Sequence, residues 1–96
     1  MAHLNSLPSL LIVDDNEENI ELLSSVLNRI DVNVIQAMSG HEALVKSAGI
    51  ELALAIVDVR MPLMSGFELA VKLNENRVEN KVPVIFLTAN YLDQEE

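Results

Sequence analysis

Four short segments rich in aliphatic residues divide the chain: residues 10–13, 32–37, 52–57 and 82–88. The first and the third are continuously apolar, without the alternation of a half-buried strand, and this pattern is typical of strands buried on both faces of a parallel sheet. Pro83 is compatible with the fourth segment because it lies at its beginning. We therefore expect four strands.

The segment between the first two strands has the periodicity of a helix. Its apolar residues recur at steps of three and four, which places them on one helical face. Asp15 with Glu18 three residues later predicts the start of this helix. The helix is expected over residues 16–30, with its apolar face formed by Ile20, Leu23, Leu27 and Ile30.

Two further helices are indicated by the Ser-x-x-Glu spacing of a capping box. The first begins at Ser39 with Glu42 and ends near Gly49; the second begins at Ser65 with Glu68. Residues 74–81 are polar and predict a loop, and residues 91–96 predict one turn of an acidic helix.

Strands and helices thus alternate through the chain with short connections. This order predicts an α/β fold with a doubly wound, open parallel sheet and helices on both of its faces. In such sheets ligands bind beyond the carboxyl ends of the strands. Asp14, Asp15, Asp58 and Thr88 all fall at those ends.

Composition narrows the class of protein. The chain has 96 residues, enough for one domain, no cysteine, and a net charge of −9. This charge repels nucleic acid and anionic membranes, so we expect neither as a partner. The first residues, MAHLNSLPS, have no cationic region before an apolar core, which predicts neither a signal peptide nor a transmembrane segment. We expect a cytoplasmic protein.

The carboxylates at the strand ends point to a metal ion. Asp14 and Asp15 follow the first strand and Asp58 follows the third. If these strands are neighbours, three like charges converge on one small crevice, which is unfavourable without a cation. Oxygen ligands without His or Cys select Mg²⁺ or Ca²⁺ over Zn²⁺, and this number of carboxylates suits Mg²⁺ better than a calcium cage.

Three separate motifs resemble the receiver domain of two-component response regulators. They are the first strand with Asp14, Asp15 and Asn16, the stretch DVRMPLMSG that begins at Asp58, and Thr88-Ala89 after an apolar strand. The resemblance runs from about Leu10 to the end of the chain, in the right order and spacing. It implies a flavodoxin-like sheet with strand order 2-1-3-4, in which the family's fifth strand is missing.

The resemblance also implies a role for each site residue. Asp58 would be the phosphoacceptor, which attacks a phosphohistidine on a histidine kinase or histidine phosphotransfer protein. Asp15 would bind Mg²⁺ directly, Asp14 partly through water, and Arg60 through its main-chain carbonyl. Thr88 would bind a phosphoryl oxygen and act as the conformational switch. Pro62 would fix a backbone angle in the following loop, and Gly66 would permit one that other residues cannot adopt.

The chain departs from the family pattern at two places. Ser65 stands where the family often has Asp, in a position expected to affect little beyond the helix start. A receiver also has a fifth strand with an aromatic switch residue, a lysine after it that pairs with the phosphoryl group, and a fifth helix. We therefore expect residues 1–96 to form an incomplete receiver domain, with residues 1–8 as a flexible tail and an output domain elsewhere. Without that lysine we expect poor phosphorylation, and we expect self-association through an open fourth strand.

Other functions fit less well. A phosphatase of the haloacid dehalogenase type uses Asp-x-Asp after a strand, whereas position 60 here is Arg, so we expect no enzyme beyond self-phosphorylation and self-dephosphorylation. A flavodoxin-like carrier needs a phosphate-binding loop after the first strand, where this chain has carboxylates. The remaining alternative is a receiver-like interaction module that is not phosphorylated.

Overall fold

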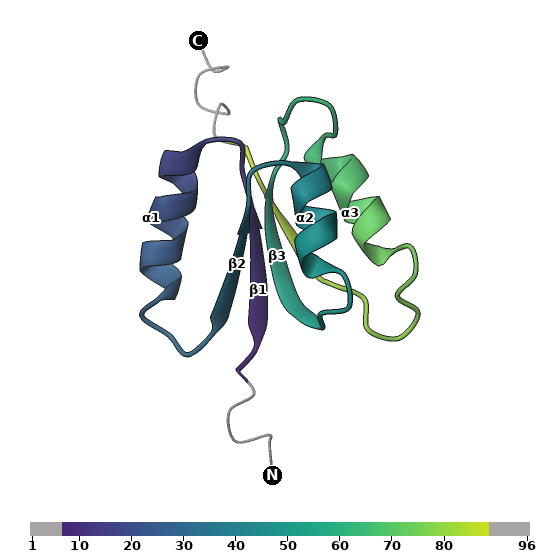
Figure 1. The fold of residues 1–96 in the computed structure, drawn as a ribbon, viewed down its shortest axis with the longest axis horizontal. Coiled ribbons are helices and arrows are strands. Elements are labelled where there is room, and N and C mark those ends of the chain that lie inside the picture. Colours follow the sequence, from purple (N-terminus) through teal and green to yellow (C-terminus); the bar gives the residue numbers. More distant parts are fainter. Residues whose placement is uncertain (1–6, 89–96) are drawn as a thin grey trace.

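The computed structural model describes residues 7–88 and consists of one parallel sheet flanked by helices (Figure 1). The four strands lie in the order β2-β1-β3-β4, and all neighbouring pairs are parallel. The predicted α/β fold and its strand order are confirmed. In chain order the elements are β1 (Ser9–Val13), α1 (Glu17–Leu27), β2 (Asn33–Ala37), α2 (Gly40–Ser47), β3 (Leu52–Asp58), α3 (Gly66–Asn74) and β4 (Val84–Leu87).

The helices form two layers. Figure 1 shows α1 against one face of the sheet, with α2 and α3 side by side against the other. A cluster of buried apolar residues lies under α2 and α3, and its strand residues include Leu11, Val13, Ala55 and Val57. Within residues 7–88 no helix has the length and apolarity needed to cross a membrane.

The continuously apolar segments are the central strands, as predicted. In β1, Leu11, Ile12 and Val13 are at most 1% exposed, because β2 and β3 flank this strand and helices cover both of its faces. In β3, Ala55 and Val57 are equally buried. The carboxyl ends of β1 and β3 therefore lie side by side at the centre of the sheet.

The first helix differs from the expectation at both ends. Asn16, and not Asp15, is its N-cap, because the Asn16 side chain accepts hydrogen bonds from the backbone N–H groups of Glu18 and Asn19. The helix ends at Leu27 instead of continuing to residue 30. Tight i→i+3 bonds follow it, including that from Ile30 N–H to the Leu27 carbonyl, and they leave Ile30 56% exposed.

The two serine caps are confirmed. Ser65 and Glu68 form a complete capping box at the start of α3. Ser39 caps α2 by accepting from Glu42 N–H, while the Glu42 carboxylate accepts from Met38 N–H, one residue before the cap. At the other end of the sheet, Asn33 N–H donates to the Pro8 carbonyl at 2.8 Å. The rest of the predicted tail, residues 1–6, lies outside the described residues.

The fourth strand is shorter than predicted and begins at Val84. Pro83 has no N–H to donate, although its carbonyl accepts from Ala55 N–H. Val82 is held instead by the Asn74 side chain, whose oxygen accepts from Val82 N–H at 2.7 Å and whose amide donates to the Val82 carbonyl at 3.1 Å. Within residues 7–88, β4 is an edge strand. The predicted helical turn over residues 91–96 lies outside the described residues.

Candidate metal and phosphoacceptor site

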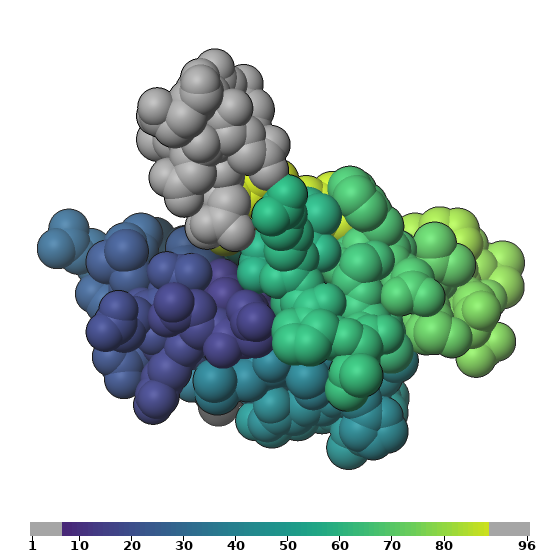
Figure 2. All heavy atoms as spheres, turned by 90° about the horizontal axis from the view of Figure 1, so that it is seen from above, coloured from purple at the N-terminus to yellow at the C-terminus, as the bar shows by residue number. Residues whose placement is uncertain are grey.

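Three carboxylates meet at the carboxyl end of the sheet. Val13 is paired with Val57, so Asp14 and Asp15 leave β1 beside the point where β3 ends at Asp58. One oxygen from each of the three side chains lies within 4.8 Å of the other two. Seen from above, the purple segment of the chain that follows β1 lies against the green segment that follows β3 (Figure 2). The structure thus brings together the three acidic residues singled out in the sequence.

Asp14 is the most firmly held of the three. Its side chain is buried, with 3% exposure, and each of its oxygens has a hydrogen-bond donor. Oδ1 accepts from Asn16 N–H at 2.9 Å and Oδ2 accepts from the Asn19 side-chain amide at 3.1 Å. Asp15, the next residue, is exposed. The crevice therefore has one fixed carboxylate and one that faces solvent.

Sequence reasoning missed Asn16 and Asn19 as residues that hold Asp14. The preference of Asn for helix caps and turns could have identified Asn16 as the N-cap of the first helix. With the helix start placed at Asn16, Asn19 falls in the first turn and faces back toward Asp14. The two asparagines orient a carboxylate without adding charge.

Asp58, at the end of β3, is buried, with 7% exposure. Arg60 N–H donates to its Oδ1 at 3.4 Å, a long contact. Burial, and next the charge of Asp14, raise the pKa of the Asp58 carboxyl above its ordinary value. This carboxylate is thus left short of partners, and a cation in the crevice would stabilise its charged form.

The donor set fits a hard divalent cation. The described ligand atoms are carboxylate oxygens, and the cluster includes neither His nor Cys. Mg²⁺ in proteins is held by one or two carboxylates and keeps several waters. Asp15, being exposed, and Asp58, being short of partners, could bind such an ion directly, while both Asp14 oxygens are already bonded.

The loop after Asp58 is shaped by a close approach of backbones. A Cβ on Gly66 would collide with the Asp58 carbonyl oxygen and with Val59 Cα. Gly66 N–H donates to the Val59 carbonyl at 2.9 Å. The expectation that Gly66 supplies an unusual backbone angle is wrong: in this loop that angle occurs at Leu63, with φ of 71°. Gly66 is needed for space, and it fixes the backbone that carries Asp58.

Thr88 follows β4 at the same edge of the sheet. Leu87 is paired with Asp58, and Val59 N–H donates to the Leu87 carbonyl at 3.0 Å. Thr88 is exposed. Thr88 thus lies beside the end of β3, and within residues 7–88 its side chain makes no hydrogen bond to the three carboxylates.

A cavity of about 730 Å³ lies at the other end of the molecule. It is bounded by the loops after α2 and α3, and Arg77 crosses it to donate to the Leu73 and Ile50 carbonyls. Its lining does not include the three clustered carboxylates. We therefore place the candidate site at the acidic crevice, which holds the reactive groups.

Comparisons with known proteins identify the family of the chain. Residues 10–95 match the sequence model of a family described as the response regulator receiver domain. Among relatives, the chain is 38% identical over 88 residues to the response regulator GtcR of Aneurinibacillus migulanus, covering 92% of this chain and 35% of that protein. It is 43% identical over 82 residues to the sensor protein EvgS of Escherichia coli K12, covering 85% of this chain and 7% of that protein. The chain thus spans about a third or less of these relatives.

Solved structures show the same fold. The chemotaxis protein CheY4 of Vibrio cholerae superposes with a TM-score of 0.78 at 28% identity, over 94% of this chain and 78% of that one. The N-terminal domain of a response regulator receiver protein from Methanoculleus marisnigri gives a TM-score of 0.77 at 30% identity, over 88% and 68% of the two chains.

Proposed function

Because this chain belongs to the family of response regulator receiver domains, we propose that it accepts a phosphoryl group on Asp58 from a phosphohistidine of a histidine kinase or histidine phosphotransfer protein. One observation carries the proposal: carboxylates from two neighbouring strand ends share a crevice in which one of them, Asp58, is buried and short of partners. A histidine kinase is among the relatives, the hybrid signal transduction histidine kinase L of Dictyostelium discoideum.

Mg²⁺ is the cofactor that these residues fit. In this proposal Asp15 and Asp58 bind it directly, Asp14 acts partly through water, and the Arg60 carbonyl is a further ligand. When bound, the ion neutralises carboxylate charge and stabilises negative charge on the transferring group. The long Arg60 contact and the raised pKa of Asp58 support an ion at this position.

The transfer itself is a nucleophilic substitution at phosphorus. An oxygen of the Asp58 carboxylate forms a bond to phosphorus, and the phosphorus–nitrogen bond of the phosphohistidine breaks. The electron pair of that bond stays on the ring nitrogen, and because the other ring nitrogen of the phosphohistidine carries a proton, the ring leaves as neutral imidazole. The product is an aspartyl phosphate at the end of β3. The Thr88 side chain then moves toward the phosphoryl group, and its hydroxyl donates a hydrogen bond to a phosphoryl oxygen. This movement of Thr88 is the conformational response.

In this role the chain is a signalling module rather than an enzyme that turns over external substrates. Its partners would be a histidine-containing donor and an output domain, in the cytoplasm. The alternative, an interaction module that is not phosphorylated, is disfavoured by the complete set of acidic residues.

Phosphoryl uptake is tested by intact-mass measurement after incubation with acetyl phosphate and Mg²⁺. The wild type should gain the mass of one phosphoryl group, and Asp58→Asn should gain none. Uptake that survives in Asp58→Asn would refute the acceptor role. Thr88→Ala should retain uptake and lose part of the shift in amide NMR signals that follows it.

Magnesium binding is tested by thermal unfolding of the wild type and Asp15→Asn. An ion present at ten times its dissociation constant stabilises the wild type by about 1.4 kcal/mol. Asp15→Asn should lose most of that response. Equal magnesium shifts in both proteins would contradict the ligand assignment.

Self-association is the last part of the proposal. Within residues 7–88, β4 is an edge strand, and its Ile85 and Phe86 are 49% and 37% exposed. Apolar edge strands pair readily with other chains. Light scattering on the 96-residue chain at several dilutions should show a dimer or larger species, and a monomer at every concentration would contradict this part.

A further inference from the structure

The carboxylate of Asp14 is held by two donors from the start of α1. Its Oδ1 accepts from Asn16 N–H at 2.9 Å, and its Oδ2 accepts from the side-chain amide of Asn19 at 3.1 Å. An ionised carboxylate only accepts hydrogen bonds, so the Asn19 amide presents its NH₂ group to it. Asp14 is buried and Asn19 is half-buried, which partly shields this contact from solvent.

Asn19 is itself fixed by the helix start. Its backbone N–H donates to the Asn16 side chain at 3.3 Å and to the Asn16 carbonyl at 3.1 Å. It follows the N-cap by three residues, and helical side chains tilt toward the N-terminus of their helix. The amide therefore reaches Asp14 from a rigid element whose backbone is already in place.

This contact restricts how Asp14 can serve a cation. An oxygen that accepts from an N–H has fewer lone pairs left, so direct coordination through Oδ2 would compete with the Asn19 hydrogen bond. While the bond is kept, Asp14 can still accept a hydrogen bond from a water that belongs to the ion. Asn19 thus favours the water-mediated role for Asp14 over direct coordination.

The two candidate cations respond differently to such a restriction. Mg²⁺ requires a near-octahedral shell at about 2.0–2.1 Å and keeps several waters, so one or two direct carboxylates suffice for it. Ca²⁺ takes about 6–8 oxygen ligands at about 2.3–2.6 Å and gains from each further carboxylate oxygen. A carboxylate that is held back from the ion therefore disfavours Ca²⁺ more than Mg²⁺.

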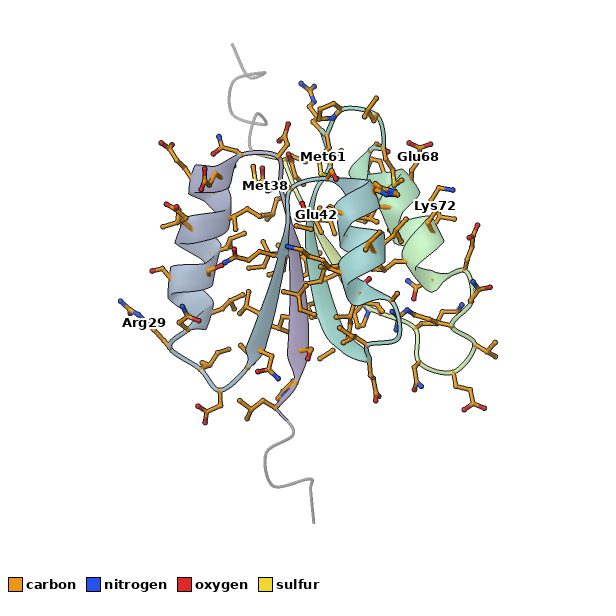
Figure 3. All side chains as sticks on the ribbon, viewed as in Figure 1. Arg29, Met38, Glu42, Met61, Glu68 and Lys72 are labelled. Atoms are coloured by element: carbon orange, nitrogen blue, oxygen red, sulfur yellow. The ribbon has the colours of Figure 1, made fainter. Side chains whose placement is uncertain are left out.

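Two other carboxylates at this end of the sheet are engaged at helix starts. Figure 3 shows Glu42 on α2 and Glu68 on α3. Glu42 accepts from Met38 N–H, and Glu68 accepts from Ser65 N–H in the capping box. Neither belongs to the group of clustered carboxylates. In the described part of the chain, the hydrogen bonding of Asp14 thus decides whether that group offers a third direct ligand.

We infer that Asn19 is a positioning residue that makes the acidic crevice prefer Mg²⁺ to Ca²⁺, because its amide holds Asp14 as an acceptor for a metal-bound water. The inference rests on the proposed metal site, in which Asp15 and Asp58 are the direct ligands. Without the amide, the Asp14 side chain is free to turn and coordinate directly. Ca²⁺ then gains a carboxylate ligand, whereas Mg²⁺ loses an oriented acceptor for its water.

The test titrates Mg²⁺ and Ca²⁺ separately into isotope-labelled protein and obtains each Kd from the shifts of amide NMR signals at constant ionic strength. Asn19→Ala and Asn19→Ser both remove the amide, and Asn19→Gln keeps it on a longer side chain. Alanine favours a helix and serine is tolerated at its start, so both variants are expected to fold. Asn28→Ala is the matched control, because it removes an exposed asparagine side chain from the other end of the same helix.

Asn19→Ala and Asn19→Ser should bind Mg²⁺ about tenfold more weakly than the wild type, as expected when the hydrogen-bond partner behind a metal ligand is lost. Both should bind Ca²⁺ as tightly as the wild type or more tightly, so the ratio of the two Kd values should shift about tenfold toward Ca²⁺. Asn19→Gln should recover part of the preference for Mg²⁺. Asn28→Ala should match the wild type for both ions.

Three outcomes would overturn the inference. Equal weakening of both ions in Asn19→Ala and Asn19→Ser would show that the amide has a structural role alone. Unchanged binding of both ions would show that the amide does not affect the site, and the same shift in Asn28→Ala would indicate a general effect on α1. The proposed metal site is refuted by a different result, Mg²⁺ binding in Asp15→Asn that is as tight as in the wild type.

Discussion

Removal of the Asp58 charge should stabilise the metal-free protein. The variant Asp58→Asn keeps nearly the same shape, and its side-chain oxygen can still accept from Arg60 N–H. The change removes a buried carboxylate that has an oxygen within 4.8 Å of each of two others. The Asp58 carboxylate is thus expected to lower the free energy of unfolding of the metal-free protein.

The size of this effect follows from the geometry. Two unit charges 4.8 Å apart repel by about 3.5 kcal/mol at an effective dielectric constant of 20 and by about 0.9 kcal/mol in bulk water. Asp14 is buried and Asp15 is exposed, so the pairs with Asp58 fall between these limits. We expect Asp58→Asn to raise the free energy of unfolding by about 1–3 kcal/mol, or the Tm by at least about 4 °C.

The assay is thermal and urea unfolding in the presence of a chelator at low salt. Asp31→Asn is the matched control, because it removes one negative charge from the exposed turn after α1, far from the crevice. Asp58→Asn should be more stable than both the wild type and this control, and the gap should close when Mg²⁺ is added to all three. Equal gains in the two variants would mean that net charge, and not local repulsion, is responsible. A less stable Asp58→Asn would refute the reasoning.

Three further predictions concern stability. Gly66→Ala should lower the free energy of unfolding by about 1–3 kcal/mol in urea unfolding, because its Cβ meets backbone, whereas Gly40→Ala should cost less, because its Cβ meets the flexible side chain of Met64. Asn74→Ala should lower the Tm, since it leaves the buried N–H and carbonyl of Val82 without their partners at about 1–3 kcal/mol. The raised pKa of Asp58 means that the native state keeps this proton to higher pH than the unfolded chain does. In metal-free buffer the free energy of unfolding should therefore fall as pH rises from the ordinary pKa through the raised one, and urea titrations across pH should show this slope in the wild type and not in Asp58→Asn.

The parts of the fold that were predictable are those set by local pattern. The uninterrupted apolar segments before Asp14 and Asp58 identified the two central strands, because only strands buried on both faces lack polar alternation. Ser39 and Ser65 identified helix starts, because each hydroxyl accepts a hydrogen bond from the backbone N–H three residues later, and so short a contact is visible in the sequence. Once these strands were neighbours, the meeting of the acidic residues followed.

The parts that were not predictable depend on contacts distant in sequence or on competition between adjacent residues. Asp15 and Asn16 are both residue types that cap helices well. Asn16 is the cap in this fold, in which the Asp14 carboxylate accepts from Asn16 N–H. Val82 is not part of the fourth strand, because its N–H and its carbonyl are both hydrogen-bonded to the Asn74 side chain. The different exposure of Asp14 and Asp15 also has no signal in the sequence, since both follow the same strand.

The parallel arrangement of the sheet has a kinetic consequence. Among the strands of residues 7–88, no two are joined by a hairpin and each pairing spans a crossover. Folding must therefore close long loops before it gains strand contacts. The three carboxylates meet only after β1 and β3 are in register. The acidic crevice is therefore absent from the unfolded chain, and we expect it to be completed late in folding. A bound cation should then lower the unfolding rate and leave the folding rate nearly unchanged.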